Sequence, residues 1–225
     1  HKSSHSFPTR RSSDLTSGSQ FRPGPPQSVL AQGFLDQARH VVQVQAALTT
    51  QQKVTAEYWA DGPNSELPPG HWTEFAAFVA DRDNLDLDAT VKLYFALANA
   101  ILDASIATWE CKRFYDYVRP VTAIRHLFRG KFLRAWGGPG VGTVQLPGES
   151  WRPFQSDTFP TPPFAEYTSG HSAFSMAAAT VLRRVTGSDT FNHHHTQQMP
   201  LKADPYEPVG GVVLQAVVVP APPSG

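Results

Sequence analysis

Two basic side chains stand close together in an otherwise apolar segment. Lys112 and Arg119 are seven residues apart, which is two turns of an α-helix, and Pro120 follows directly. Residues at that spacing lie on one helical face, so both side chains are expected to project to the same side at the end of a helix. A Lys and an Arg at this spacing are more often a solvated stripe. Here the neighbouring Trp109 and Cys111 indicate an apolar setting, in which cations need an anionic partner.

A second candidate segment is Tyr167-Thr168-Ser169-Gly170-His171, where a loop turns into a helix expected to start near Ser172. The free N–H groups and the dipole of a helix start favour an anion. Ser169 offers a hydroxyl donor, Gly170 has no Cβ to obstruct a ligand, and His171 can give or take a proton. Alone, this segment could be a capped helix start with an incidental His. Together with the basic pair, it predicts a cradle for a tetrahedral oxyanion.

A mostly helical chain must position these residues. Apolar side chains recur at helical spacing along the middle of the sequence, and there is no internal repeat and no strand-rich segment. The fold class is therefore predicted to be all-α, a helical bundle whose longest helix is central and largely buried. The predicted helices cover residues 29–48, 49–59, 72–79, 89–118, 121–128 and 172–185, with Ser28, Thr49 or Thr50, and Asp86 or Asp88 as N-caps and Gly187 as the last C-cap.

Proline and glycine mark the predicted breaks. Pro120 lacks an N–H and biases Arg119 away from helical backbone, so the longest helix should end at or just before Arg119. Residues 62–70 are expected to form a loop. Residues 131–168 are rich in Gly, Pro and Trp and are expected to form a much longer loop, and loops of that length are usually functional or disordered.

Composition limits the partners of the whole chain. Its 225 residues are 40% hydrophobic, enough for a domain with a sizeable core, and 19 basic residues balance 19 acidic ones. No whole-chain field therefore favours nucleic acid or an anionic membrane. No uninterrupted apolar run reaches the length of a membrane-spanning helix, so we expect no membrane span. The single cysteine, Cys111, excludes an internal disulfide and is expected to be a small buried apolar residue.

Both ends differ from the middle. Residues 5–15 resemble the translation of a common short-read sequencing adapter, and residues 16–27 are rich in Ser, Gly and Pro. Residues 1–27 are therefore expected to be an assembly artefact followed by a disordered, flexible leader. Residues 209–225 show neither helical periodicity nor alternation and are expected to be an irregular or frameshifted tail. The helical domain, itself expected to be partial, is then residues 28–208.

The two candidate segments in this order resemble the first two signature blocks of the superfamily of type-2 phosphatidic acid phosphatases, bacterial acid phosphatases and vanadium haloperoxidases. Further segments resemble the haloperoxidase branch, and the resemblance covers residues 29 to 208. These segments are Trp109-Glu110-Cys111-Lys112, Trp136-Gly137-Gly138-Pro139, Gly148-Glu149-Ser150-Trp151 and the run from Thr161 to Tyr167.

The resemblance implies a helical bundle that holds vanadate. Lys112, Arg119, Ser169 and the Gly170 amide would bind its oxygens, His171 would be the acid–base group, and Phe164 would lie in the halide pocket. The implied reaction oxidises halide with hydrogen peroxide to hypohalous acid, which passes to a small organic acceptor. Phosphate, also a tetrahedral anion, would fit the same groups as a competitor or alternative. Export to the periplasm or outside the cell is expected by family analogy only.

One block of the family pattern is not found. In the family, an Arg and then a His on a later helix supply a further cation and the ligand to vanadium. His193, His194 and His195 come too soon after His171 and are expected to be an exposed loop segment. The metal ligand is therefore unassigned, and this chain is expected to be inactive and poorly soluble. The alternatives that remain are a haloperoxidase, a phosphomonoester hydrolase and an oxyanion-binding remnant without activity. The halide, the organic acceptor and the oligomeric state are left open.

Overall fold

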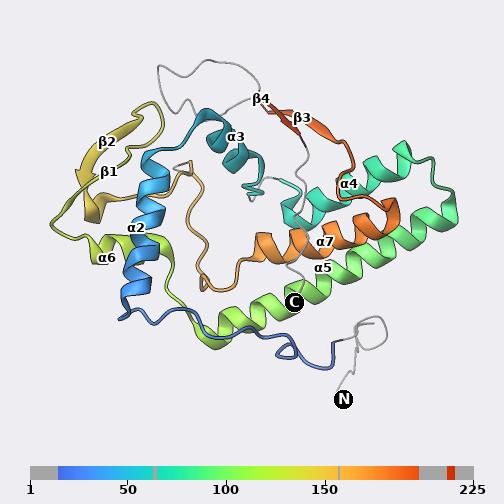
Figure 1. The fold of residues 1–225 in the computed structure, drawn as a ribbon, viewed down its shortest axis with the longest axis horizontal. Coiled ribbons are helices and arrows are strands. Elements are labelled where there is room, and N and C mark those ends of the chain that lie inside the picture. Colours follow the sequence, from blue (N-terminus) through green and yellow to red (C-terminus); the bar gives the residue numbers. More distant parts are fainter. Residues whose placement is uncertain (1–14, 63–64, 157, 198–211, 216–225) are drawn as a thin grey trace.

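The chain folds into a bundle of helices with a β-hairpin at one end (Figure 1). The computed structural model describes residues 15–62, 65–156, 158–197 and 212–215. Its helices are α2 (Gln32–Ala46), α3 (Thr50–Tyr58), α4 (Leu67–Arg82), α5 (Leu87–Tyr115), α6 (Pro120–Leu127), the 3-10 helix η1 (Gly148–Ser150) and α7 (Gly170–Thr186). Its strands are β1 (Phe132–Trp136), β2 (Thr143–Pro147), β3 (His194–Gln197) and β4 (Val212–Gln215). The predicted all-α class is confirmed.

The larger of two hydrophobic cores lies where α4, α5 and α7 pack together. Apolar side chains of each helix meet there, and Phe191 joins the cluster with its ring 5.4 Å from that of Phe75. Burial of large apolar side chains is the main stabilising contribution to such a bundle. The fully or nearly fully buried members are Trp72, Phe75, Ala76, Val79, Leu93, Leu97, Ile101, Phe174, Ala178, Ala179, Leu182 and Phe191.

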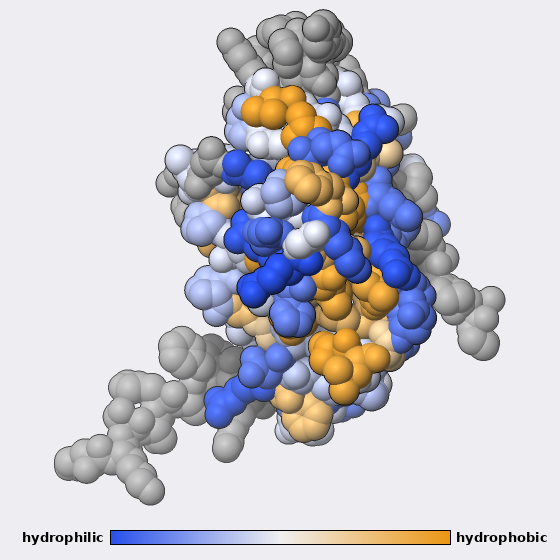
Figure 2. All heavy atoms as spheres, turned by 90° about the vertical axis from the view of Figure 1, so that its left-hand side faces the viewer, coloured by the Kyte–Doolittle hydropathy of each residue, from blue (hydrophilic) through white to orange (hydrophobic). Residues whose placement is uncertain are grey.

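The second core joins α2, α6 and the hairpin. It contains Ala38 and Val42 of α2, Ile124 of α6, and Ala135 and Trp151. The hairpin strands are antiparallel, with Phe132 opposite Pro147 and Trp136 opposite Thr143. The space-filling view from this end shows apolar side chains at the surface among hydrophilic ones (Figure 2). The exposed large apolar residues of these elements include Val41, Val44 and Phe132.

Several predicted helix boundaries are confirmed by their caps. Thr49 forms a capping box with Gln52, in which each residue's side chain bonds the other's backbone N–H. The Asp86 carboxylate accepts a hydrogen bond from the Ala89 amide at 2.8 Å at the start of α5. Gly187 closes α7 with a φ of 67°, a left-handed conformation that glycine adopts without a Cβ clash. The predicted start of α2 at Ser28 is wrong, because Ala31 is its N-cap.

The two predicted loops are partly wrong. Residues 62–70 were expected to be irregular, yet α4 begins at Leu67 with proline in its first positions. Proline fits the first turn of a helix because its missing N–H has no partner there in any case. The long loop at residues 131–168 contains the β1–β2 hairpin and η1. Hydrophobic alternation over strands this short is too weak to be seen against the surrounding Gly and Pro.

The leader at residues 16–27 was expected to be flexible, but side chains from the helical domain hold it against α5. Arg22 forms an ion pair with Glu110, and its guanidinium lies over the ring of Phe114. Three tyrosine hydroxyls donate hydrogen bonds to leader carbonyls: Tyr115 to Pro23, Tyr167 to Gly24 and Tyr117 to Gln27. The leader's own composition could not predict this, because the donors belong to other segments.

The longest helix, α5, was predicted to be largely buried, and this is wrong. Leu93, Leu97 and Ile101 face the core, but Phe95 is 62% exposed and Val91, Leu102 and Ile106 are also exposed. The stretch Leu87–Leu127, which includes α5, is long and apolar enough by length and composition to cross a membrane, and only 17% of its most apolar window is buried. The expected absence of a membrane span is therefore not confirmed. Core helices of soluble proteins pass the same test, which makes this weak evidence for a span.

The segment after α7 is more ordered than predicted. The ring of His193 lies 5.1 Å from that of Phe75 and 4.9 Å from that of Phe78, so it packs against α4 and is not a free loop residue. Residues 194–197 and 212–215 pair as antiparallel strands. Residues 212–215 belong to the tail that was expected to be irregular, so that expectation is corrected at these four positions. Residues 209–211 and 216–225, like residues 1–14, lie outside the described part of the chain.

Candidate oxyanion site

Arg119 does not lie on the same helix as Lys112, contrary to the prediction. Helix α5 ends at Tyr115, and Asp116 follows with a φ of 43°, a left-handed conformation that stops the helix. Arg119 has extended backbone and is the N-cap residue of α6, directly before Pro120. The two cations nevertheless reach the same place, because both contact the backbone of residues 164–166. We call this stretch the 164–166 segment.

Lys112 is almost fully buried, with 4% of its surface exposed. Its Nζ donates hydrogen bonds to the carbonyl of Ala165 at 2.9 Å and to that of Glu166 at 2.8 Å. The ammonium also lies 5.1 Å from the ring centre of Phe164. An ammonium has three donors, so one N–H of Lys112 remains beyond the two bonds to carbonyls.

Arg119 contacts the 164–166 segment from the start of α6. Its Nη1 donates a long hydrogen bond of 3.5 Å to the carbonyl of Phe164, and its guanidinium carbon lies 5.2 Å from the centre of that ring. The Nε of Arg119 is buried and has no hydrogen-bond partner among the residues that the structure describes. A buried guanidinium donor without an acceptor is costly, so the side chain is suited to an anion.

Burial lowers the pKa values of both cations, Lys112 and Arg119. The pKa of Lys112 falls to about 8, chiefly because burial disfavours the charged amine and secondly because Arg119 is nearby, while Glu166 acts in the opposite direction. Burial also lowers the pKa of Arg119. A positively charged pair that pays this desolvation cost would be stabilised by a bound anion.

The N-terminus of α7 adjoins the 164–166 segment in the chain and supplies the other predicted donors. Ser169 is the N-cap residue, and its Oγ accepts a hydrogen bond from the Ser172 amide at 3.3 Å. Because the hydroxyl accepts there, its own hydrogen remains available to a ligand. Helix α7 begins at Gly170, two residues earlier than predicted, so His171 lies within its first turn.

Trp109 joins the end of α5 to the start of α7. Its ring stacks on Phe174 with centroids 6.0 Å apart and lies 5.4 Å from the ring of Phe164. A Cβ built on Gly170 would meet the Trp109 ring at 3.4 Å, an ordinary van der Waals contact. The side of Gly170 on which a Cβ would stand therefore faces the indole of Trp109. These contacts bring the helix that carries Lys112 against the helix start that carries Ser169 and His171.

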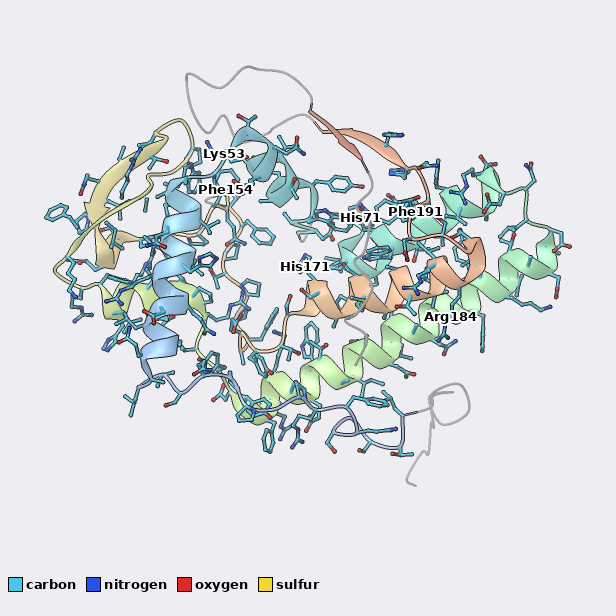
Figure 3. All side chains as sticks on the ribbon, in the orientation of Figure 1. Lys53, His71, Phe154, His171, Arg184 and Phe191 are labelled. Atoms are coloured by element: carbon cyan, nitrogen blue, oxygen red, sulfur yellow. The ribbon has the colours of Figure 1, made fainter. Side chains whose placement is uncertain are left out.

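His171 faces a buried carboxylate that sequence reasoning missed. Its side chain is half exposed, and its Nε2 lies 3.9 Å from Oδ2 of Asp61. The other oxygen of Asp61 lies 3.0 Å from Nδ1 of His71 on α4. Figure 3 shows His71 and His171 directed toward the same region from two helices. The one available signal was a histidine directly before the apolar helical run that begins at Trp72.

Asp61, Glu66 and His71 also form the group of possible metal ligands found in the described part of the chain. One ligand atom from each lies within 4.8 Å of the others, but Glu66 is exposed. Oδ1 of Asp61 already accepts a hydrogen bond from Nδ1 of His71. The cluster alone is therefore not assigned as a metal site.

Comparisons with known proteins identify the family of this chain. Residues 92–216, more than half of the chain, match the family model of the VCPO second helical-bundle domain. The vanadium chloroperoxidase of Curvularia inaequalis is 29% identical over 142 residues, which are 56% of this chain. A solved apo-type bacterial vanadium-dependent chloroperoxidase shares the fold with a TM-score of 0.76 over 91% of this chain at 24% identity. A solved bacterial vanadium-dependent iodoperoxidase has a TM-score of 0.63 over 81% of this chain at 29% identity.

The chain spans only part of each relative. The matched region is 21% of the Curvularia inaequalis protein, 44% of the bacterial chloroperoxidase chain and 40% of the iodoperoxidase chain. The match to the family model nevertheless includes both helices of the candidate site, α5 from its second turn and all of α7. This chain belongs to the vanadium chloroperoxidase family, through that family's second helical-bundle domain.

Proposed function

We propose that this chain provides part of the oxyanion site of a vanadium-dependent haloperoxidase. The observation that carries the proposal is the approach of Lys112 and Arg119, from two different elements, to the 164–166 segment. The buried Lys112 and the half-buried Arg119 surround one short backbone stretch beside the start of a helix, and they need an anion to balance them. Relatives that carry vanadium in their names make vanadate the proposed anion.

The residues present fit a tetrahedral oxyanion. Lys112 has one remaining N–H, the Nε of Arg119 lacks a partner among the described residues, and the Ser169 hydroxyl has a free hydrogen. The Gly170 amide would add a donor from the start of α7. Each charge-assisted hydrogen bond would contribute about 1.5–3 kcal/mol. When bound, vanadate would supply Lewis-acid activation of hydrogen peroxide toward a halide.

His171 is the proposed acid–base residue. It lies in the first turn of α7, two residues after Ser169, and half of its side chain is exposed. A group in that position can give a proton to, or take one from, an oxyanion oxygen or peroxide at the helix start. Phe164, which is 38% exposed beside both cations, is the proposed wall of the halide pocket. The related structures are named for chloride and iodide, so the family covers more than one halide.

Enzyme assays distinguish the proposed activity from phosphomonoester hydrolysis, for which phosphate would occupy the same groups. The halide reaction should require both vanadate and peroxide, whereas hydrolysis of p-nitrophenyl phosphate should be inhibited by vanadate. For the 225-residue chain alone we expect neither reaction, because we have not identified in its sequence the histidine that would bond vanadium or, in a phosphatase, attack phosphorus. Vanadate-dependent halide oxidation by the purified chain would contradict that expectation, and hydrolysis without halide oxidation would favour the phosphatase.

Oxyanion affinity is expected to fall about tenfold between pH 7 and pH 9. The pKa of Lys112 is about 8, so most of the amines are charged at pH 7 and about a tenth are charged at pH 9. Tungstate is a suitable probe because it stays a dianion over this range, and its binding can be followed by isothermal titration calorimetry. Lys112→Arg, which keeps its charge throughout, should bind with little pH dependence. Equal affinities of the unmodified chain at both pH values would contradict this role for Lys112.

A further inference from the structure

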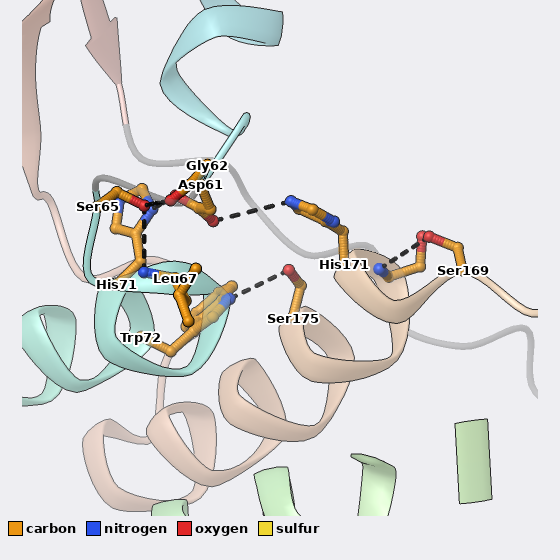
Figure 4. A network of polar contacts seen from close by, with 10 residues as sticks. Asp61, Gly62, Ser65, Leu67, His71, Trp72, Ser169, His171 and Ser175 are labelled. Atoms are coloured by element: carbon orange, nitrogen blue, oxygen red, sulfur yellow. Dashed lines mark hydrogen bonds and ion pairs between the residues drawn. The ribbon is translucent and has the colours of Figure 1, made fainter. Parts of the chain in front are cut away.

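Asp61 lies between two imidazoles (Figure 4). Its side chain is only 3% exposed, and its Oδ1 accepts a hydrogen bond from Nδ1 of His71 at 3.0 Å. Its Oδ2 is buried, has no hydrogen-bond partner among the described residues, and lies 3.9 Å from Nε2 of His171. A buried carboxylate oxygen without a donor is costly. Among the described residues, His171 places a ring nitrogen toward it.

His71 is fixed by an aromatic surround. Its ring stacks on Trp59 at 4.9 Å, lies 4.8 Å from Phe75, and meets the edge of Tyr58 at 4.7 Å. Only 5% of its side chain is exposed. Because a carboxylate can only accept, the proton of this contact must lie on Nδ1 of His71. The ring therefore has one orientation, in which its Nδ1–H points at Asp61.

We infer that His71 is a positioning residue that holds Asp61 so that its second oxygen accepts a hydrogen bond from Nε2 of His171. The present distance of 3.9 Å is longer than a hydrogen bond, and a small rotation of the half-exposed His171 would close it. This contact fixes the proton of a neutral His171 on Nε2 and leaves Nδ1 as the free ring nitrogen. The role of this free nitrogen rests on the proposed function: Nδ1 of His171 faces the bound oxyanion and is the atom that accepts or returns a proton.

One oxygen of Asp61 accepts from His71, and the other is inferred to accept from His171. One isosteric change at Asp61 therefore tests the inference. In Asp61→Asn, the Nδ1–H of His71 would still select the carbonyl oxygen of the amide. The NH₂ group would then face His171, which would have to accept with Nε2 and carry its proton on Nδ1. If His71 did not hold residue 61, the amide could turn and offer its oxygen to His171 instead. Inversion of the His171 tautomer is thus a direct consequence of positioning by His71.

The test is long-range ¹H–¹⁵N correlation spectroscopy on the full chain labelled with ¹⁵N-histidine, at pH 8.5 and without any oxyanion. The signals of His171 are assigned by their loss in His171→Ala. We expect the Nε2–H form in the unmodified chain and the Nδ1–H form in Asp61→Asn. His71→Phe keeps a ring among the surrounding aromatic side chains but removes the donor. In this variant His171 should lose its strong preference for the Nε2–H form. His71→Asn, whose amide nitrogen can take the place of Nδ1, should restore it.

Unchanged His171 signals in Asp61→Asn, or in a folded His71→Phe, would overturn the inference. Stoichiometric binding of Zn²⁺ that shifts the His71 signals would also overturn it, because the metal would occupy the nitrogen assigned as the donor. If His71→Phe does not fold, Asp61→Asn still decides the question, since it preserves size and shape. These spectra contain no oxyanion, so a failure of vanadate to bind would count against the proposed function and not against this contact.

Discussion

Lys112→Met should weaken oxyanion binding by at least about tenfold and lower the free energy of unfolding by about 2 kcal/mol. The methionine keeps a similar apolar stem but leaves the carbonyls of Ala165 and Glu166 without their donor. An unsatisfied buried acceptor costs about 1–3 kcal/mol, and removal of a poorly solvated charge offsets part of that cost. Urea unfolding and calorimetric titration with vanadate measure the two effects.

Lys92→Met is the matched control for that experiment. Lys92 lies on the same helix and is 74% exposed, and it forms an ion pair with Asp88 one turn away. An exposed pair of this kind contributes about 0.5 kcal/mol at most, so its loss should change stability little and anion affinity not at all. If Lys112→Met behaved like Lys92→Met in both assays, Lys112 would not be part of the site.

Trp72→Ala should be the most destabilising of the changes considered, at about 3–5 kcal/mol. Trp72 is 4% exposed in the larger core, and its indole N–H donates to the Ser175 hydroxyl at 3.1 Å, which ties α4 to α7. Truncation leaves a large cavity in the packing that positions the start of α7. Circular dichroism measures this effect as a large fall in the midpoint temperature of cooperative thermal unfolding.

Two further variants separate packing from hydrogen bonding. Trp72→Phe keeps most of the apolar volume and loses the indole donor, so its loss of stability should be clearly smaller than that of Trp72→Ala. Trp109→Ala removes the same side chain from a position that is 42% exposed and should also cost less. A loss below about 1 kcal/mol for Trp72→Ala would show that α4 and α7 are held together mainly by other contacts.

Local sequence signals predicted the helical elements well where a cap or a periodic apolar face was present. The capping box at Thr49, the N-cap at Asp86 and the glycine after α7 each depend on residues within one turn, so the sequence shows them directly. Periodicity could not show which of the apolar residues of α5 would be covered. Phe95 and Leu97 are both apolar, but one is 62% exposed and the other 1%, because only one face meets α4 and α7.

The candidate site was predicted in its residues but not in its geometry. Lys112 and Arg119 were expected to share a helical face, whereas the helix ends between them and the 164–166 segment brings them together. That segment lies more than forty residues away in sequence, and no local pattern predicts the contact. Asp61 and His71 were missed for the same reason, because their importance comes only from their distance to His171.

The most direct test of the proposed site is equilibrium dialysis of vanadate against the purified 225-residue chain, with Arg119→Lys and Arg119→Gln alongside. The arrangement of Lys112, Arg119 and the start of α7 predicts saturable binding at one site per chain, competition by phosphate, a modest loss for Arg119→Lys, and a loss of about tenfold or more for Arg119→Gln. Absence of saturable binding, or equal affinities for all three proteins, would contradict the assignment of these residues as an oxyanion site.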